Sequence, residues 1–443
     1  MTLHQNLFHL HQTTDRLSDD INHWLDLCDA AEKRGDYAEV LCAGDNIIRL
    51  APDKPQPHFI RGFALQRLDR IEEAIEAYRR VLALHPDYAD AWINLGECLQ
   101  HLNRIEEAEQ ACRKAIEAHG QKIGDERTPE EDYGKHHWNL ALTELLKGDF
   151  THGFAHYRGR FKAVTGKKRP DFPRPLWRGE DLRGKTIFVT PDQGHGDTLM
   201  MARYLPLLRE RGARVLMQVQ PALMPFLQNW SGVDQVLQWE RDALPDFDFH
   251  ASEFDLPHYF GTTLENVPTK IPYLPLLSPD EVTRMPENGK LKIGVVWAGN
   301  PSHHNDKRRS IPLEAFAPLF AVEGIQFFSL NRDRREGDAE RLTRLPLTDL
   351  APRLNDFAAS ARLVGQLDLV ICCDTAIAHL AGGMGTSVWT LLPFAPSWHW
   401  MLEREDSPWY PTLRLFRQKT RGDWNAVIER VMVALTTWRD SAH

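Results

Sequence analysis

The sequence is poor in cysteine and has no long hydrophobic run. Its six cysteines do not have the spacing of a disulfide framework, and adjacent Cys372 and Cys373 cannot easily bridge in a strand. No segment approaches the roughly 18 apolar residues of a membrane-spanning helix. The first ten residues lack the basic and apolar stretches of a secretory signal. We therefore expect no transmembrane segment and a location in the reducing cytoplasm.

The charge balance lacks a basic surplus. The 443 residues carry a net charge of −9, which argues against nucleic acid as a partner. Residues 1–163 hold 20 basic and 28 acidic side chains, whereas the remainder holds 33 and 34. The acidic surplus therefore belongs to the front of the chain, and basic clusters in the rear can meet an anionic ligand. The length favours two or three domains.

A repeat with a period of 34 residues occupies the front of the chain. The segments RIEEAIEAYRR and RIEEAEQACRK, which begin at Arg70 and Arg104, are nearly identical. Gly62 and Gly96 share one offset of this period. Small residues at such offsets let the two helices of a hairpin approach, which is the signature of tetratricopeptide (TPR) repeats. We predict an α-solenoid of about four repeats, the last one after an irregular loop at 120–133.

The pattern changes to alternating strands and helices after a basic, proline-rich linker. Strands are predicted at 186–191 (TIFVTP) and 214–219 (RVLMQV), with a helix at 197–211 between them. A second series includes the strands KIGVVWA at 292–298 and LDLVICC at 367–373. This alternation predicts parallel sheets with right-handed crossovers, and two such lobes place a cleft between the carboxyl ends of their sheets.

The predicted domains follow from these two patterns. They are a TPR domain at 1–163, a linker at 164–184, Rossmann-like domains at 185–289 and 290–420, and a C-terminal helix at 421–443 that packs back on the α/β unit.

The first motif follows the strand at 186–191 and opens a helix. Its residues are Gln193, Gly194, His195, Gly196, Asp197 and Thr198. Glycines let backbone approach a ligand closely, and a helix start offers free N–H groups. Asp197 has two interpretations: an N-cap of the helix, or a general base that removes a proton from an attacking hydroxyl.

The second motif follows the strand at 367–373. Its residues are Asp374, Thr375, Ala376 and His379. Thr375 and the first helical N–H groups are placed to hold a phosphate, while His379 either supports that turn or packs in the core. The following AGGMG segment is not a dinucleotide fingerprint, so NAD is not expected.

A cationic loop follows the strand at 292–298. Its candidate residues are Asn300, Lys307, Arg308, Arg309 and Ser310. Three consecutive cations at a strand end suit a pyrophosphate, although a solvated loop is the alternative. The pair His303 and His304 suggests a metal site. Adjacent histidines point to opposite sides in most backbones, however, so no metal is expected.

These motifs resemble the bacterial TPR-linked glycosyltransferases of the heptosyltransferase-like (family 9-like, GT-B) group. The resemblance covers most of the chain after about residue 135. It rests on GDF at 148, QGxGDT at 193, VWAGNPxHxND from 296, DTAxAHLAG from 374, LLPFAPxWxW from 391 and EDSPWYPTxRLFRQ from 405. It implies that Asp197 is the general base beside the acceptor, and that the Asp374 turn and the cationic loop hold the donor's diphosphate.

The sequence departs from that group at some candidate positions. Relatives often have Gln-Lys where this chain has Asn331 and Arg332, and often Leu at His195. Arg332 keeps the charge with a different geometry, which is expected to alter the choice of donor. Asn331 and Arg332 are counted among the donor-binding candidates.

The resemblance implies an inverting, metal-independent glycosyltransferase without a cofactor. It would move a sugar from a nucleotide-activated donor to a hydroxyl of a protein acceptor, such as flagellin or another surface protein, that binds the concave TPR surface. Two alternatives remain open: a sugar transferase for lipopolysaccharide or glycolipid, and a non-catalytic TPR scaffold that binds nucleotide sugar. The repeats could also mediate homo-oligomer formation.

Overall fold

The computed structural model describes residues 19–120, 134–161, 169–239, 242–303 and 305–441. Contacts divide the chain into two compact units, Met1–Arg169 and Pro170–His443. Each unit is considered by itself.

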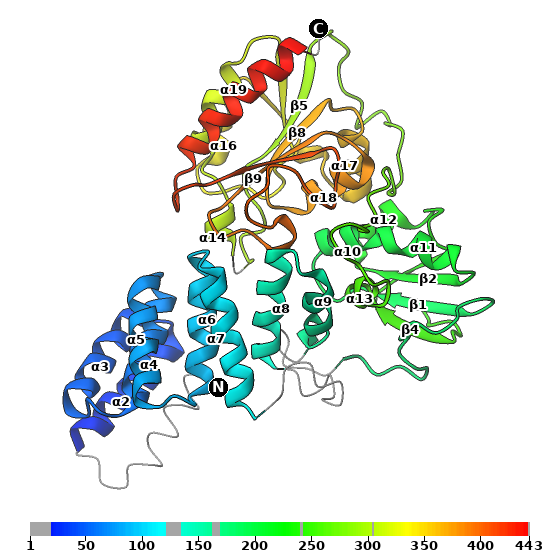
Figure 1. Cartoon of the computed structure of the whole chain (residues 1–443). Coiled ribbons are helices and arrows are strands. Elements are labelled where there is room, and N and C mark those ends of the chain that lie inside the picture. The colour runs from blue at the N-terminus through cyan, green and yellow to red at the C-terminus, as the bar shows by residue number, and fades with distance from the viewer. Residues whose placement is uncertain (1–18, 121–133, 162–168, 240–241, 304, 442–443) are drawn as a thin grey trace. The chain divides into compact units, whose positions relative to one another are not determined.

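The described part of the first unit consists of consecutive helix pairs (Figure 1). Each helix packs on its successor in the pair, and the pairs pack on one another. The pairs are α2 (Asp19–Arg34) with α3 (Tyr37–Leu50), α4 (Pro55–Arg67) with α5 (Ile71–Leu84), α6 (Ala89–His101) with α7 (Ile105–Ala118), and α8 (Lys135–Lys147) with α9 (Phe150–Tyr157). The predicted TPR array is thereby confirmed. Most of the predicted loop at 120–133 lies outside the described residues.

The recurring glycines lie where two helices of a pair are closest. A Cβ atom on Gly62 would lie 2.8 Å from Cε1 of Tyr78, and one on Gly96 would lie 3.0 Å from Sγ of Cys112. Tyr78 is completely buried, and its hydroxyl donates to Gln66 Oε1 at 2.9 Å. The repeat offset therefore has a packing cause: a larger residue would separate the helices.

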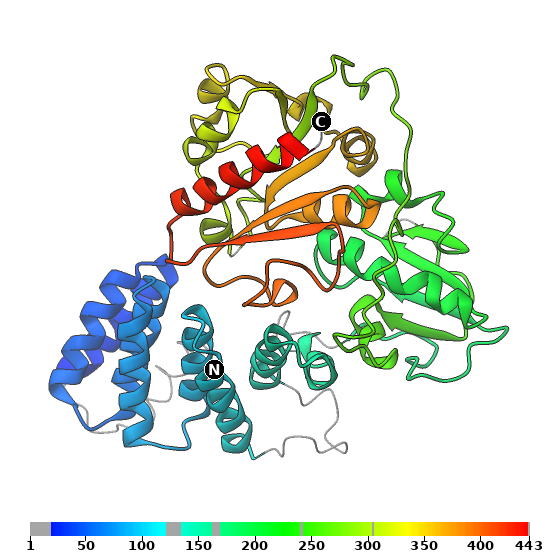
Figure 2. The same ribbon diagram turned by 45° about the horizontal axis from the view of Figure 1, so that its top comes forward.

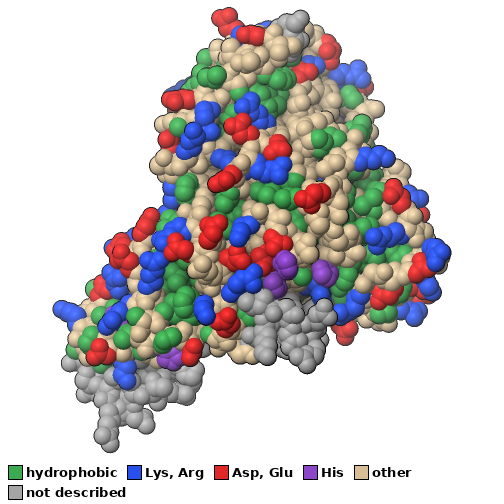
Figure 3. All heavy atoms as spheres, viewed as in Figure 1, with side chains coloured by type: hydrophobic (Ala, Val, Ile, Leu, Met, Phe, Trp, Pro, Cys, Tyr) green, Lys and Arg blue, Asp and Glu red, His purple; other side chains and the backbone are tan. Residues whose placement is uncertain are grey.

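Charged side chains of both signs are interspersed on the face drawn in Figure 3. In the first unit several belong to ion pairs, such as Arg61 with Asp45 at 2.9 Å and Lys147 with Glu109 at 2.6 Å. Exposed pairs of this kind contribute little to stability, typically about 0–1 kcal/mol.

The second unit contains two parallel sheets. The smaller sheet has the order β3-β2-β1-β4, and the larger has the order β10-β9-β8-β5-β6-β7. The strands are β1 (Thr186–Thr190), β2 (Arg214–Val219), β3 (Gln235–Gln238), β4 (Phe249–Ser252), β5 (Leu291–Val296), β6 (Ile325–Ser329), β7 (Leu347–Asp349), β8 (Leu369–Cys373), β9 (Val388–Leu392) and β10 (Leu413–Arg417). The predicted pair of Rossmann-like sheets is confirmed.

The central strands are covered on both faces, as parallel sheets require. Every residue of β8 and β9 is buried. The C-terminal helix α19 (Asn425–Ser441) contacts β10, and Figures 1 and 2 show it lying along the larger sheet. Strand β4 lies in a stretch where the sequence pattern is irregular, and it is a strand that the sequence did not indicate.

The helix predicted at 197–211 is wrong in its bounds. The chain instead forms α10 (His195–Met201), a 3-10 turn η3 (Ala202–Tyr204) and α11 (Leu205–Glu210). Pro206 lies at the start of α11, where its missing N–H group breaks the hydrogen-bond ladder. The helix also begins at His195, two residues before the predicted start. Asp197 therefore lies inside the first turn of the helix.

No helix among the described residues is both long enough and apolar enough to cross a membrane.

Candidate active site

The starts of two helices from the two lobes of the second unit lie against each other. Helix α10 follows β1 of the smaller sheet, and α18 (Ala376–Met384) follows β8 of the larger sheet. A Cβ atom on Gly196 would lie 2.9 Å from Cδ2 of His379 and 3.2 Å from Cα of Ala376. Only glycine allows this approach, so the fold brings the two sequence motifs together at one point.

Asp197 is not the N-cap of α10. Gly194 takes that position, and Asp197 is the third helical residue, whose Oδ2 accepts the Gly194 N–H at 3.0 Å. Burial raises the pKa of Asp197 to about 6, and the nearby Asp192 and Asp374 also raise it, against the lowering effects of His399 and the Gly194 N–H. The side chain stays partly exposed. The group can therefore accept a proton near neutral pH.

A second carboxyl group lies behind Asp197. Glu253 is 4% exposed, and its Oε1 accepts from Thr198 Oγ1 at 3.2 Å. Burial raises the pKa of Glu253 well above its ordinary value, and the charges of Asp192 and Asp197 raise it further. Gln220 donates to Thr198 Oγ1 at 3.0 Å. Thr198 is thus held between an amide and a carboxyl group, which fixes the first turn of α10.

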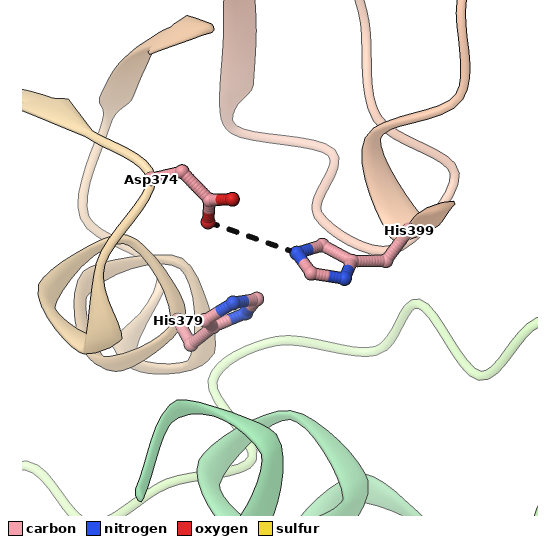
Figure 4. A group of neighbouring side chains, drawn as sticks. All are labelled: Asp374, His379 and His399. Atoms are coloured by element: carbon pink, nitrogen blue, oxygen red, sulfur yellow. Dashed lines mark ion pairs between the residues drawn. The ribbon is translucent and has the colours of Figure 1, made fainter. Parts of the chain in front are cut away.

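Asp374 is a buried carboxylate at the end of β8. Its Oδ2 accepts from Ser397 Oγ at 2.7 Å, and its Oδ1 lies 3.8 Å from His399 Nε2. Burial by itself would raise the pKa of Asp374, but the nearby His399 and the Ser397 hydroxyl hold it well below the usual range. Figure 4 shows Asp374, His379 and His399 pointing toward one another. A negative charge therefore persists at this turn.

His379 packs inside the protein, against Trp400 and Tyr410. Its ring stacks on Trp400 with centroids 5.3 Å apart, and its Nδ1 lies 2.9 Å from the hydroxyl of Tyr410. Burial and the charge of His399 lower the pKa of His379 to about 3. His379 is therefore a packed core residue, and its support of the turn stays a prediction.

One cluster within the described residues has the composition of a metal site. Asp374, His379 and His399 each offer a ligand atom within 4.8 Å of the others. Two ligands of one ion at bonds of about 2.1 Å can be at most about 4.2 Å apart. Ser397 and Tyr410 already bond to two members of the cluster. Protein partners thus account for Asp374 and His379, whereas Nε2 of His399 has no hydrogen-bond partner among the described residues. The absence of a metal stays a prediction, and His304 lies outside the described residues.

Donor groups at the start of α18 are available to an anion. Thr375 is the N-cap residue, and its Oγ1 has no hydrogen-bond partner among the described residues. Arg309 donates through Nη1 to the Asp374 carbonyl at 3.1 Å, while its buried Nε has no such partner within the same residues. A hydroxyl, a guanidinium and a helix N-terminus therefore lie around one turn, where they favour negative charge.

The cationic loop is held by a residue that the sequence did not indicate. Arg335 donates to the Gly299 carbonyl at 3.0 Å and to Ser310 Oγ at 3.1 Å, and it pairs with Asp306. Ser310 Oγ also accepts the Gly299 N–H at 3.1 Å. Ser310 therefore shapes the loop in which α14 (Asp306–Arg309) carries the cations.

The two candidates after β6 have different environments. Asn331 is 1% exposed, and its Oδ1 accepts the N–H groups of Trp297 and Ala298 at 3.0 and 2.8 Å. This amide oxygen is therefore engaged in holding the end of β5. Arg332 is exposed, and it lowers the pKa of His195 after the larger effect of burial. The charge of Arg332, which follows a strand of the larger sheet, thus acts on His195 in the smaller lobe.

The remaining candidates lie at the periphery. Asn300 and Lys307 are exposed, and Arg308 is half-buried. The Gln193 carbonyl accepts from Gln220 at 3.1 Å. Two surface hollows lie elsewhere, one between α19 and β10 and one beside α11. The cleft between the lobes stays a prediction.

The AGGMG segment serves packing. A Cβ atom on Gly382 would lie 2.6 Å from Tyr410, and one on Gly383 would lie 2.5 Å from Leu274. The Gly383 carbonyl accepts the N–H of Tyr273 at 3.0 Å. The glycines let the segment that joins the two lobes lie directly on α18.

Several functional neighbours were missed from the sequence. Glu253 follows β4, whose sequence has no clear hydrophobic pattern. Arg335 lies in a charged stretch that is typical of a solvent-exposed loop. His399 and Tyr410 occur within the segments from 391 and 405. Those two segments were among those that carried the resemblance, so the resemblance is the signal that could have led to these residues.

Two protein-family models match the chain. Residues 61–123 match the tetratricopeptide repeat, and residues 315–408 match glycosyltransferase family 9 (heptosyltransferase). The second segment includes Asp374, His379 and His399. The chain therefore combines TPR repeats with a glycosyltransferase family 9 domain.

Individual proteins show similarity over different parts of the chain. Protein FlbA of Caulobacter vibrioides is 27% identical over 343 residues, which are 69% of this chain and 55% of FlbA. The chain thus spans about half the length of this curated relative. A family 9 glycosyl transferase from Veillonella parvula is similar over 60% of this chain and all of its own, at 12% identity and a TM-score of 0.43. A mutant O-GlcNAc transferase from Thermobaculum terrenum is similar over 96% of this chain and 94% of its own, at 15% identity and a TM-score of 0.33.

Proposed function

We propose that the protein transfers a sugar from a nucleotide-activated donor to a hydroxyl group, with inversion and without a metal ion. The observation that carries the proposal is the contact of Gly196 with Ala376 and His379. It places a carboxyl group with a pKa of about 6, Asp197, beside a turn rich in anion-binding groups. A base and a diphosphate site so close together suit direct displacement at a sugar carbon.

In this proposal Asp197 removes the proton of the acceptor hydroxyl as the hydroxyl oxygen attacks. The bond from the sugar carbon to the diphosphate oxygen breaks at the same time, and the leaving group takes both electrons. Arg309, Thr375 and the first N–H groups of α18 stabilise the charge that the diphosphate gains. This arrangement is supported by the groups on Arg309 and Thr375 that lack a partner among the described residues.

We further propose that the acceptor is a protein or peptide held by the TPR array. TPR repeats are present in the chain, and repeats of this kind expose extended concave surfaces that bind peptides. Tethering the acceptor raises its effective concentration near Asp197. A surface protein such as flagellin is the candidate acceptor.

The proposal is tested by finding the leaving group and then the product. Thermal shift with UDP, GDP, ADP, TDP and CMP should identify one nucleotide that raises the melting temperature. The matching nucleotide sugar is then incubated with candidate acceptors, and sugar addition is followed by mass spectrometry. Nucleotide binding without any product, on protein or lipid, would favour the scaffold alternative.

The acceptor class is tested separately. A chain that starts at Pro170 lacks the first unit. Under our proposal it loses transfer to protein but keeps transfer to a small hydroxyl acceptor. Equal activity of both chains on lipopolysaccharide or glycolipid would instead favour the lipid alternative.

A further inference from the structure

Aromatic rings surround the buried guanidinium of Arg203, which is 3% exposed. Its carbon lies 4.6 Å from the ring centre of Tyr410 and 4.8 Å from that of Tyr273. Its nitrogens donate to the carbonyls of Trp409 at 2.6 Å and Pro268 at 3.1 Å. Arg203 thus joins the smaller lobe to the segment between the lobes and to the larger lobe.

The proton of the Tyr273 hydroxyl is already engaged. This oxygen accepts from Arg203 Nη2 at 3.0 Å and donates to the Leu199 carbonyl at 3.1 Å. Its contact with the Tyr410 hydroxyl is longer, 3.5 Å. Because a carbonyl can only accept, the Tyr273 proton lies on the Leu199 bond. The Tyr410 hydroxyl therefore keeps its own proton for its nearest acceptor.

That nearest acceptor is Nδ1 of His379, at 2.9 Å. The ring cannot turn away, because it stacks on Trp400 and its Cδ2 lies against Gly196. Nε2 is bonded to Cδ2, so it is directed to the junction of the two helix starts. A neutral imidazole carries one proton, and the bond made by one nitrogen decides which nitrogen holds it.

We propose that Tyr410 is a positioning residue that donates to Nδ1 of His379 and thereby keeps the His379 proton on Nε2, as a hydrogen-bond donor for the leaving phosphate of the sugar donor. The role toward phosphate rests on the proposed function, whereas the tautomer does not. The other tautomer would place the ring proton on Nδ1, where it would face the proton that the Tyr410 hydroxyl donates. Burial lowers the pKa of His379 to about 3, so the ring is neutral when this choice is made.

The test is ¹⁵N NMR of the full chain labelled on histidine at pH 7.5. The signals of His379 are assigned among the 20 histidines as those lost in His379→Gln. The expected spectrum has an unprotonated Nδ1 and a protonated Nε2. In Tyr410→Phe the Nδ1 partner is lost, and the signals should shift toward a mixture of tautomers. The Michaelis constant for the sugar donor should rise roughly tenfold, with a smaller change in kcat, as expected for one lost hydrogen bond.

The matched control is Tyr204→Phe. Tyr204 is also buried, and its hydroxyl bonds to Thr262 Oγ1 at 2.8 Å rather than to a histidine. This variant should leave both the His379 signals and the donor Michaelis constant unchanged.

The wild-type spectrum alone decides the tautomer, so the proposal stays testable even where Tyr410→Phe does not fold. A wild-type His379 protonated on Nδ1, or on both nitrogens, overturns it, and so do unchanged His379 signals in a folded Tyr410→Phe. A wild type that shows the expected tautomer but transfers no sugar refutes the proposed function instead. In that case the relay from Tyr410 to His379 stands as a structural feature.

Discussion

Gly196 of α10 and His379 of α18 are in contact, so that a Cβ atom on the glycine would come within 2.9 Å of the imidazole. They lie 183 positions apart in the sequence and belong to different lobes. Replacement of Gly196 by alanine should therefore separate the helix starts, because the opposing atoms are backbone and a clamped ring. We expect a loss of about 1–3 kcal/mol in stability and at least a roughly tenfold loss in kcat/KM.

The control for this prediction is Gly365→Ala. Gly365 has φ −64°, and a Cβ atom there would meet no atom closer than 3.4 Å. Thermal unfolding and initial rates are measured for both variants. Equal effects of the two substitutions would show that the contact with His379 has no special importance.

Asp197→Asn should abolish most of the transfer and leave nucleotide binding intact. General-base catalysis contributes typically about 10²–10⁴-fold, and asparagine cannot take a proton. Because burial raises the pKa of Asp197 to about 6, the wild-type kcat/KM should rise with pH through about 6 and level above it. Initial rates between pH 4.5 and 8.5 and calorimetry with the nucleotide check both parts. Exposed Asp171→Asn is the control and should behave as wild type.

Asp197 should also reduce the stability of the fold at neutral pH. Its folded pKa of about 6 lies above the ordinary value of 3.8, so the folded state binds the proton more tightly than the unfolded chain. Ionisation of Asp197 therefore does not lower the free energy of unfolding below about pH 4. The loss of stability grows as the pH rises through about 6 and reaches its full size above that pH. Asp197→Asn should melt at a higher temperature than wild type at pH 8 and at the same temperature near pH 4. A lower melting temperature at pH 8 would contradict this.

Arg309→Ala should weaken nucleotide binding roughly tenfold or more. Its guanidinium bonds to the Asp374 carbonyl and keeps a buried Nε without a partner within the described residues. Charge-assisted bonds to phosphate are worth about 1.5–3 kcal/mol. Isothermal calorimetry measures the affinity. Arg344→Ala serves as the control, because Arg344 is exposed and forms an ion pair with the exposed Glu340. Unchanged affinity in Arg309→Ala would remove this residue from the donor site.

Asn331→Ala should act first on stability. The amide oxygen accepts two buried N–H groups at the end of β5, and each buried group left without a partner costs about 1–3 kcal/mol. Arg332→Ala, at the exposed neighbouring position, should leave the melting temperature unchanged and weaken donor binding. Chemical denaturation and donor titration separate the two effects. If Asn331→Ala is as stable as wild type but binds the donor weakly, Asn331 contacts the donor directly.

Local patterns predicted the architecture because they depend on local physics. The 34-residue offset of Gly62 and Gly96 reflects the helix crossing at Tyr78 and Cys112. The runs at β1, β5 and β8 are apolar because parallel strands are covered on both faces. Strand β4 was missed because its four residues, FHAS, include a histidine and a serine, so they do not form an apolar run.

The candidate site was predictable in part. The turns at Asp197 and Asp374 were visible as polar residues directly after buried strands. The position of Asp197 within its helix was wrong, because the sequence does not show that Gly194 begins the helix. Asn331 was predicted to bind the donor because it follows β6. In the structure it is buried, and its amide oxygen accepts the backbone N–H of Trp297.

The sequence by itself determined the repeat, the two alternating series and the turns that carry Asp197 and Asp374. Each is set by residues close in the chain, through helix period, strand burial and the needs of a helix start. Only the tertiary structure decided that Gly196 meets His379, and that Glu253, Arg335 and Tyr410 hold the groups around that contact. Those partners come from strand ends and loops far apart in the sequence, and their approach depends on how the two lobes pack.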